Sequence, residues 1–379
     1  MTDASFGNLT DCGDGLYVHV PFCATRCAYC AFYGEQPRRQ DIDAYLRCLE
    51  LEWRMRGMGG SFETIFFGGG TPGALSCADF EKISKFLPID DVALREWTVE
   101  LSPATVTAEK LRLFNDLAVT RLSIGVQSFN DGTLAAMGRR QLAKKSLDAY
   151  ALCREFDFSI NLDLIFNVPG QTMQSWEKDL ELAIAIGPDH LSTYCLTVEA
   201  EALLWKNEKP QMNSDDLEFY ELTWNILAAN GYEHYEVSNF CRPGRRCLHN
   251  CNGWAMGEWL GLGPSAASQF RRRRFRNVAN LNLWMDGICR NSPVEEDAVP
   301  LSRHLLAEDS IMFAMRTCDG ISVAALAAAQ EFASADLASL FEDFRDYGLV
   351  VFANGRAKPT DRGLLLADAM ALEILKCFK

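Results

Sequence analysis

Residues 17–32 read Tyr17-Val-His-Val-Pro-Phe-Cys-Ala-Thr-Arg-Cys-Ala-Tyr-Cys-Ala-Phe32 and place three cysteines just after the first strand-like run of the chain. Cys23, Cys27 and Cys30 are spaced so that their thiolates can hold one inorganic cluster. A cubane iron–sulfur cluster has four irons, and an electron-transfer cluster is normally closed by four thiolates. No fourth cysteine stands nearby, because Ala31 and Phe32 follow Cys30. The motif therefore predicts a cluster with one iron open to a non-protein ligand.

A structural zinc knot and a set of three reduced surface thiols are the alternative interpretations of this motif. A closed zinc site needs four ligands, usually supplied as two close pairs. The one nearby additional candidate is His19, which alternates with Tyr17 along a strand. The motif therefore favours the open cluster, with Cys23, Cys27 and Cys30 as its ligands.

Composition narrows the class of protein. With 379 residues, the chain is expected to form one large domain and a smaller one. Its net charge of −14 argues against nucleic acid as a main partner, although residues 271–274 and Arg276 form a local basic run that predicts a solvated face. Fourteen cysteines without paired spacing favour a reducing compartment. The N-terminus lacks the features of a signal peptide, and no apolar run is long enough to span a membrane, so we expect a cytoplasmic protein.

Short apolar or β-branched runs alternate with longer helical patterns in the first half of the chain. The predicted strands cover residues 16–20, 64–67, 98–101, 121–126, 159–166 and 190–197. The predicted helices between them cover residues 42–55, 78–86, 108–117, 143–156 and 173–186. Such alternation implies parallel strands joined by crossover helices. The sequence thus predicts an α/β fold, a partial (βα)6 barrel of the TIM type, with functional groups at the C-terminal ends of its strands.

The alternation stops near residue 205. A helix over 215–229, an extended run over 232–237 and a stretch rich in Gly, Pro, Arg and Cys over 239–263 follow. Helices are then predicted over 303–316, 323–331, 335–347 and 362–377, with a β pair across the hairpin turn signal Asn354-Gly355. We expect an N-terminal tail (1–14), the barrel (15–240), a connecting segment (241–300) and a small C-terminal helical or winged-helix-like domain (301–379).

Polar residues and glycines recur where the predicted strands end. The second strand ends in Phe66-Phe-Gly-Gly-Gly-Thr-Pro72, and consecutive glycines let a backbone approach a ligand closely. Glu100, Gln127 and Asp163 lie in or at the ends of the next three strands. Arg139 follows the loop after Gln127 and can meet a carboxylate with two hydrogen bonds. Because a barrel rim collects such groups, we expect one site there.

The three-cysteine motif resembles the signature of the radical S-adenosylmethionine (SAM) superfamily, in which the open iron chelates SAM. The segments around Cys23, Gly69 and Gln127, together with residues 163–172 and 190–199, resemble the oxygen-independent coproporphyrinogen III oxidase group over nearly the whole chain. The resemblance implies that the three cysteines hold a [4Fe-4S] cluster. It also implies SAM contacts for Tyr17, Tyr29, Gly69, Gly70, Thr71, Glu100, Gln127, Arg139 and Asp163.

Two branches of this group differ at the position of Phe32. The decarboxylating dehydrogenase has a fourth cysteine there and a longer N-terminal segment, whereas the HemW-type haem chaperones have Phe and a His-Asn-x-x-Tyr-Trp motif. This chain has Phe32 and His249-Asn250-Cys-Asn-Gly-Trp254. By that resemblance His249 is the expected haem ligand, and a histidine hydrogen-bonded within an irregular loop is the alternative.

Three departures from the chaperone pattern weigh against haem binding. Gly253 replaces the tyrosine of the motif, Gln141 stands where the family often has histidine, and Ala267 replaces another histidine of the family. Cys247 and Cys251 flank His249 and can supply a thiolate ligand instead.

The resemblance implies a function as well as a fold. We expect a cytoplasmic HemW-type protein that holds a [4Fe-4S] cluster and SAM and transfers haem to acceptor proteins, with a reductant such as flavodoxin or ferredoxin. The first rival is a coproporphyrinogen III dehydrogenase, in which a 5′-deoxyadenosyl radical starts loss of carbon dioxide from two propionates. The second rival is a radical SAM methyltransferase or a porphyrin-opening relative on the same barrel.

Overall fold

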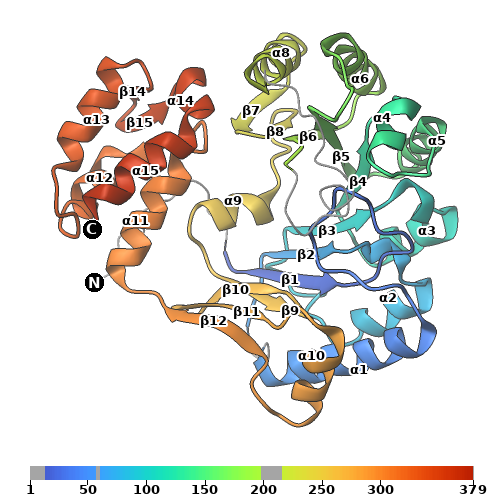
Figure 1. The fold of residues 1–379 in the computed structure, drawn as a ribbon. Helices are drawn as coiled ribbons and strands as arrows, with labels where there is room; N and C mark the ends of the chain where they lie inside the picture. Colours follow the sequence, from blue (N-terminus) through green and yellow to red (C-terminus); the bar gives the residue numbers. More distant parts are fainter. Residues whose placement is uncertain (1–12, 57–59, 198–215, 379) are drawn as a thin grey trace.

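The computed structural model describes residues 13–56, 60–197 and 216–378. Six parallel strands lie side by side in chain order and curve into an open barrel (Figure 1). They are β1 (Gly15–Val20), β2 (Thr64–Gly69), β3 (Glu96–Leu101), β4 (Arg121–Gln127), β5 (Ser159–Phe166) and β6 (His190–Cys195). The predicted partial (βα)6 barrel is therefore confirmed.

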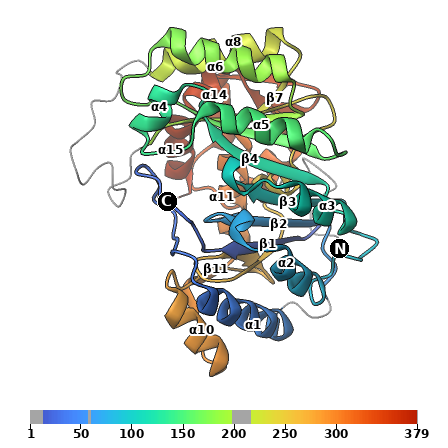
Figure 2. The same cartoon turned by 90° about the vertical axis from the view of Figure 1, so that its right-hand side faces the viewer.

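Helices cover the outer face of these strands. Figures 1 and 2 show them following one another around the outside of the barrel. They are α1 (Arg39–Arg56), α2 (Cys77–Ser84), α3 (Ala108–Asp116), α4 (Asp131–Ala136), α5 (Ala143–Cys153), α6 (Met173–Ile186) and α8 (Asp216–Ala229). The short helix α4 was not predicted. Glu199 and residue 215, which belong to predicted segments, lie outside the described residues.

The strands separate an apolar outer face from a polar interior. In β1, Leu16, Val18 and Val20 are fully buried against the helices. Tyr17 and His19 alternate with them and therefore face the barrel interior. The hydroxyl of Tyr17 and Nδ1 of His19 are 3.1 Å apart. Because side chains alternate along a strand, every second residue packs into the core and the residues between them face the interior of the barrel.

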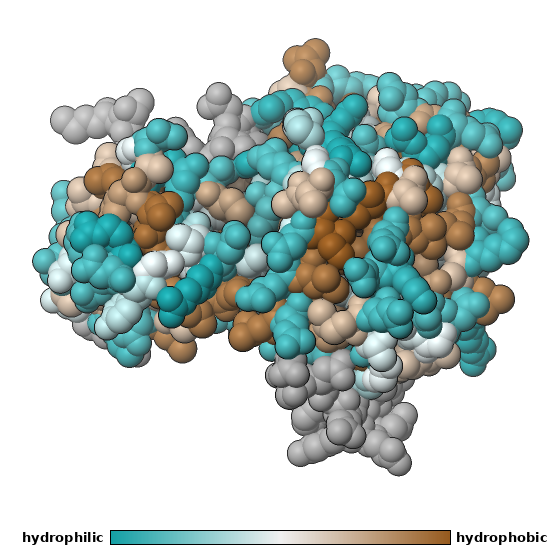
Figure 3. All heavy atoms as spheres, turned by 90° about the horizontal axis from the view of Figure 1, so that it is seen from above, coloured by the Kyte–Doolittle hydropathy of each residue, from teal (hydrophilic) through white to brown (hydrophobic). Residues whose placement is uncertain are grey.

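Helices α6 and α8 pack against each other as well as against the sheet. Figure 3 looks down on this end of Figure 1 and shows apolar side chains in a strip between hydrophilic ones. Ile184 of α6 and Leu222 of α8 are partly buried and pack against the main core. This pair of helices thus closes the barrel wall beside β6.

Short strands extend the sheet at both edges. Next to β6 lies β8 (Asn239–Cys241), which runs antiparallel to β6, and β7 (Glu233–Glu236) pairs antiparallel with β8. On the other edge β9 (Trp259–Leu262) runs parallel to β1, followed by β10 (Ala267–Phe270), β11 (Arg273–Asn277) and β12 (Glu295–Pro300). Between β11 and β12, α10 (Leu281–Cys289) packs on α1. Residues 259–300 therefore belong to the sheet that carries the site.

The C-terminal residues form a small domain with its own core. Its helices are α11 (Arg303–Ala314), α12 (Val323–Ala329), α13 (Leu337–Asp346), α14 (Asp361–Leu365) and α15 (Ala367–Cys377). Strands β13 (Ile321–Ser322), β15 (Arg356–Pro359) and β14 (Val350–Ala353) form a three-stranded sheet. Asn354 and Gly355 both have positive φ, at 52° and 72°, as the predicted hairpin turn requires. The expected small C-terminal domain is confirmed.

This domain docks on β7 through the turn after α11. The amide of Cys318 donates to the carbonyl of Tyr235 at 3.1 Å. Arg246 Nη1 lies 2.5 Å from Asp319 Oδ2, and the same guanidinium pairs with Glu233. Arg246 precedes α9 (Leu248–Trp254), which lies at the centre of Figure 1. One side chain thus links the C-terminal domain, the sheet edge and α9.

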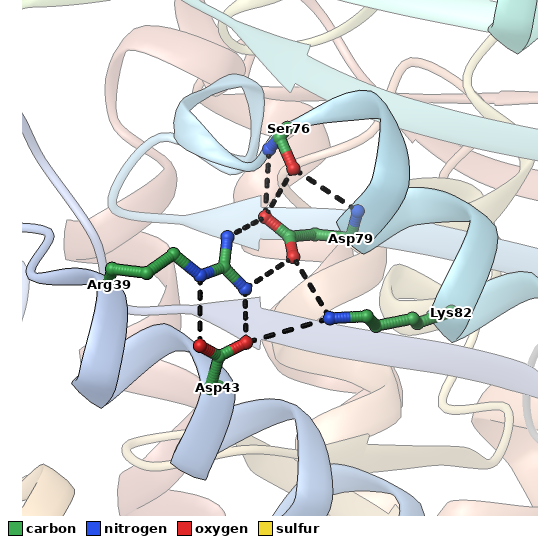
Figure 4. Close-up of polar contacts among 5 residues, drawn as sticks. All are labelled: Arg39, Asp43, Ser76, Asp79 and Lys82. Carbon is green, nitrogen blue, oxygen red and sulfur yellow. Dashed lines mark hydrogen bonds and ion pairs between the residues drawn. The ribbon is translucent and has the colours of Figure 1, made fainter.

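An ion-pair network fastens α1 to α2 (Figure 4). Arg39 contacts Asp79 through two hydrogen bonds of 2.7 and 2.8 Å and also binds Asp43. Asp79 is 1% exposed, and its carboxylate also accepts hydrogen bonds from the hydroxyl and amide of Ser76, which caps α2. Lys82 lies 3.5 Å from Asp43. The loop before α1 carries the cysteines, and the loop before α2 follows the glycines. The network therefore fixes the positions of these two loops relative to each other.

We expect replacement of Asp79 by alanine to lower the free energy of unfolding by about 1–3 kcal/mol. The substitution removes a buried carboxylate that joins two helices and caps one of them. Urea unfolding measures the change. The exposed pair Lys144–Asp148 within α5 is the matched control, and Asp148→Ala should cost less than about 0.5 kcal/mol. Equal losses in both variants would contradict the assigned role of Asp79.

Candidate functional site

The three cysteines lie in the cluster loop, residues 21–38 between β1 and α1, at the C-terminal ends of the barrel strands. Cys23, Cys27 and Cys30 are all partly exposed free thiols. Within the described ranges, no three His, Cys, Asp or Glu side chains converge as the ligands of one metal ion would. In a cubane cluster each thiolate binds a different iron, so its cysteines need not converge in that way.

The end of β2 holds the cluster loop through its backbone. The amide of Gly70 donates to the carbonyl of Val20, and the amide of Thr71 donates to the carbonyl of Phe22, both at 2.9 Å. Thr71 Oγ1 lies 3.8 Å from Cys23 Sγ. Residues 68–72 form the glycine loop, and its backbone contact with the cluster loop depends on the absence of side chains at the glycines.

Two glycines are required by this packing. A Cβ on Gly70 would lie 3.0 Å from Cys23 Sγ and 3.0 Å from the amide nitrogen of Phe22. Gly69 has a φ of 107°, and a Cβ there would lie 2.6 Å from the ring of His19. The structure therefore places Gly70 and Thr71 beside Cys23, and Gly69 beside His19.

The turn after α4 holds the other side of the cluster loop. The amide of Ala28 donates to the carbonyl of Met137 at 3.3 Å, and Gly138 has a φ of 73°. Arg139 Nη1 donates to the carbonyl of Gly125 at 2.8 Å, and its guanidinium also hydrogen-bonds Tyr29 and Cys27. Arg139 Nε is buried and finds no hydrogen-bond partner in the described part of the chain. Tyr29 and Arg139 are thus both at the cluster loop, and a polar ligand can satisfy that nitrogen.

Gln127 ends β4 in a strained conformation. Its φ is 71°, and the register between β4 and β5 shifts between Gly125 and Gln127. A Cβ built on Gly125 would lie 2.9 Å from Gln127 Nε2 and 3.6 Å from Arg139 Nη2, so the amide and the guanidinium are neighbours. A non-glycine residue at positive φ costs free energy that is often retained at functional sites.

Two carboxylates face the barrel interior. Asp163 accepts hydrogen bonds from Ser123 Oγ at 3.1 Å and from Asn161 Nδ2 at 2.8 Å. Burial raises the pKa of Glu100 to about 8, and the negative charge of Asp163 adds to that rise. Burial raises the pKa of Asp163 as well. Glu100 also lies beside the glycine loop, because a Cβ on Gly68 would be 3.2 Å from its carboxyl carbon. This pair favours a ligand that carries positive charge.

Arg121 is the interior residue that sequence reasoning missed. It opens β4, is 3% exposed, and its charge acts on both Glu100 and Asp163. The available signal was a charged residue at the start of an otherwise apolar barrel strand, where burial of an unpaired charge is costly. His190 was also unassigned, and its ring lies 2.6 Å from both Asn161 Oδ1 and Tyr235 Oη.

His249 lies at the opposite end of the strands from the cluster loop. Its Nδ1 is 2.8 Å from the hydroxyl of Thr64, the first residue of β2, and its ring packs beside Phe66 and Tyr17. Glu96 accepts hydrogen bonds from the amides of Leu248 and His249 at 3.0 and 3.1 Å, which fixes the start of α9. The structure therefore does not bring His249 into the group around the cysteines.

Burial keeps the side chains of His249 and Cys247 uncharged. Burial lowers the pKa of His249 to about 4 and raises the pKa of Cys247 to about 12. Cys251 is buried with Tyr235 in a separate small cluster. His234 stacks on Phe240 with ring centroids 4.5 Å apart. Near neutral pH, His249 is therefore a neutral imidazole and Cys247 a thiol.

Three thiols beside a glycine loop at the open end of a (βα)6 barrel define a protein of the radical SAM class. The Radical SAM superfamily matches residues 17–183, and the HemN C-terminal domain matches residues 301–366. The chain belongs to the HemW family. It is 30% identical to "Heme chaperone HemW" of Bacillus subtilis, covering 93% of this chain and 96% of that protein, and 32% identical to the Lactococcus lactis protein of that name, covering 82% and 83%.

The solved structure of coproporphyrinogen III oxidase (HemN) from Escherichia coli has the same fold. Its TM-score is 0.83 at 23% identity, with 96% of this chain and 90% of that chain covered. Family membership implies a [4Fe-4S] cluster and SAM, which agrees with the two expected cofactors. Among the helices that the structure describes, none is long and apolar enough to cross a membrane.

We expect Glu100 to make a contribution to the stability of the SAM-free protein that is lost as the pH rises from about 4.5 to about 8. Folded Glu100 keeps its proton up to about pH 8, whereas an unfolded Glu loses it near 4.5, so folding becomes less favourable across that range. In the Glu100→Gln variant this contribution is absent, so the stability of the wild-type protein relative to the variant should fall across that range. Urea midpoints measured at several pH values test this, and parallel curves for the two proteins would contradict it.

Proposed function

We propose that Cys23, Cys27 and Cys30 hold a [4Fe-4S] cluster whose open iron binds SAM. Two features support this: the cysteines lie in one loop held by the glycine loop, and the position of a fourth thiol is occupied by Phe32, which is 72% exposed. The donor set fits, since three thiolates suit a cluster and leave one iron free. The cluster would supply an electron to SAM.

We propose that the remaining groups of the rim orient SAM. Asp163 and, once it has lost its proton, Glu100 offer negative charge to its amino and sulfonium groups, and Arg139 offers a guanidinium to its carboxylate. Gln127 lies next to Arg139, while Gly69 and Gly70 leave the backbone before Thr71 without side chains that would obstruct a ligand. Tyr17 of β1 lies beside Phe66, and Tyr29 of the cluster loop packs beside Leu134 and Met137, so each would offer an aromatic ring to the ligand. These residues hold and orient the ligand, and their burial excludes water.

We propose that the protein acts as a haem chaperone, receiving haem as cargo and passing it to acceptor proteins, with a flavodoxin- or ferredoxin-like reductant. The observation that carries this is the similarity over almost the whole chain to proteins named heme chaperone HemW. Phe32 in place of a fourth cysteine agrees with that branch. The proposed location is the cytoplasm.

His249 is the proposed axial ligand of the haem. Its neutral imidazole is the form that coordinates iron, and the Phe66 ring beside it suits a flat macrocycle. The rival function, coproporphyrinogen III dehydrogenase, is favoured by the likeness of the fold to HemN. Turnover of coproporphyrinogen by the reconstituted protein would establish the rival.

We expect about four irons and four sulfides per chain after anaerobic reconstitution, as a cubane cluster requires. SAM should change the EPR signal of the reduced cluster because it binds the open iron. Replacement of Cys27 by alanine should abolish cluster binding, whereas Cys377→Ser in α15 should leave it intact. A full cluster in the Cys27 variant would mean that another cysteine is the ligand.

We expect wild-type protein to bind about one haem per chain and His249→Ala to shift or lose the Soret band, since the axial bond is gone. Apolar contact contributes about 25 cal/mol per Å² of surface removed from water, so weak residual binding is compatible with the proposal. His304→Ala, on α11, is the matched control. The absorbance of the cluster should remain unchanged in both variants. Failure of the wild-type protein to take up haem at micromolar concentration would refute the proposal.

A further inference from the structure

Two thiols from distant parts of the chain meet on the outer side of the barrel. Cys48 lies in α1 and Cys289 is the last residue of α10, and their sulfurs are 3.6 Å apart. Among the cysteines that the structure describes, this is the only pair with sulfurs in hydrogen-bonding contact. Neither thiol belongs to the cluster loop, and the contact does not rest on the proposed function.

The two helices that carry these thiols are firmly packed together. Trp284 of α10 is fully buried, and its ring lies 5.6 Å from that of Tyr45 in α1. Cys48 Sγ also contacts the carbonyl of Met285 at 3.9 Å. A disulfide needs its sulfurs about 2.05 Å apart, so side-chain rotations must shorten the contact while the helices stay in place.

The two thiols differ in access to solvent. Cys48 is 3% exposed, and burial together with the neighbouring Cys289 raises its pKa to about 12. Cys289 is exposed. Because the thiolate is the species that is oxidised, the exposed thiol reacts first and the buried thiol completes the bond.

We propose that Cys48 and Cys289 form a reversible oxidation site for hydroperoxides, closing a disulfide between α1 and α10. The Cys289 thiolate attacks the outer peroxide oxygen, and the O–O bond breaks to give a sulfenic acid and, after protonation, water or an alcohol. The Cys48 sulfur then attacks the sulfenic sulfur, and its proton leaves with the hydroxyl as water. Two electrons pass from the two thiols to the peroxide, and a dithiol reductant reverses the change.

The disulfide would secure a helix that contacts the cluster loop. The amide of Leu281, the first residue of α10, donates to Tyr33 Oη at 2.6 Å. Tyr33 Oη donates to Glu35 Oε1 at 3.0 Å, and the carbonyl of Glu35 accepts a hydrogen bond of 2.9 Å from the amide of Cys23. The oxidised protein would therefore retain α10, and with it this support of the loop, under conditions that destroy iron–sulfur clusters.

The experiment exposes the full-length purified protein to hydrogen peroxide in small molar excess, blocks free thiols with iodoacetamide, and maps peptides without reduction. The expected result is one peptide pair joined through Cys48 and Cys289, which disappears after treatment with dithiothreitol. The urea midpoint of the oxidised wild-type protein should rise, because a cross-link between distant residues restricts the unfolded chain. Cys289→Ser should show neither the linked peptides nor the rise.

Cys153→Ser is the matched control, since Cys153 is also a buried thiol but contacts no other sulfur in the described part of the chain. This variant should form the linked peptides as the wild type does. The proposal is overturned if peroxide converts Cys289 to sulfinic acid while Cys48 stays free. It is also overturned if Cys289 links to a different cysteine or to a second chain. Neither result bears on cluster or haem binding, which are tested separately.

Discussion

Two backbone hydrogen bonds between the ends of neighbouring strands fix the position of the loop that carries the three cysteines. Gly70 and Thr71 donate to the carbonyls of Val20 and Phe22 and so join the end of β2 to the start of the cluster loop. Such contact is possible only when no side chain intervenes, and for that reason the glycines are as necessary as the cysteines. The network of Arg39, Asp43 and Asp79 then fixes the helices that follow both loops. The cysteine spacing therefore functions only within this backbone framework.

The charge distribution inside the barrel complements the ligand that this family implies. Glu100 and Asp163 are close enough to raise the cost of ionising both, and burial adds to that cost. Arg121 supplies positive charge but is placed toward the start of β4, away from the rim. A cationic ligand at the rim would neutralise the negative charge that the side chains of the barrel leave unbalanced. The affinity for a cationic ligand is consequently linked to the protonation of Glu100, and binding of that ligand should release the proton of Glu100.

Sequence patterns revealed the barrel because its strands are long enough to show periodicity. The parallel strands contain six to eight residues and alternate apolar with polar side chains, as β1 does from Leu16 to Val20. Strands β8 and β9 have only three and four residues, too few for a period to appear, so the extension of the sheet was not predicted. Proline and glycine around them predicted loops instead.

The candidate site was predictable in part. Cysteines, glycines and strand-end polar groups were identified because their residue types and positions already express their chemistry. The location of His249 could not be derived from the sequence, since it depends on how α9 packs at the start of β1 and β2. The contact between His249 and Thr64 joins residues about 185 positions apart in the chain. The burial of Arg121 was hidden for the same reason, because Tyr235 and Cys247 approach it only after folding.

The guanidinium of Arg246 connects the C-terminal domain to the edge of the barrel sheet. It binds Asp319 of that domain and Glu233 of β7, and it directly precedes the residues whose amides Glu96 holds. Displacement of the domain would separate partly buried ion pairs and pull on the first turn of α9. The ring of His249 would move with that turn, because His249 belongs to it. A protein that docked on the C-terminal domain could therefore alter the floor of the barrel without entering it.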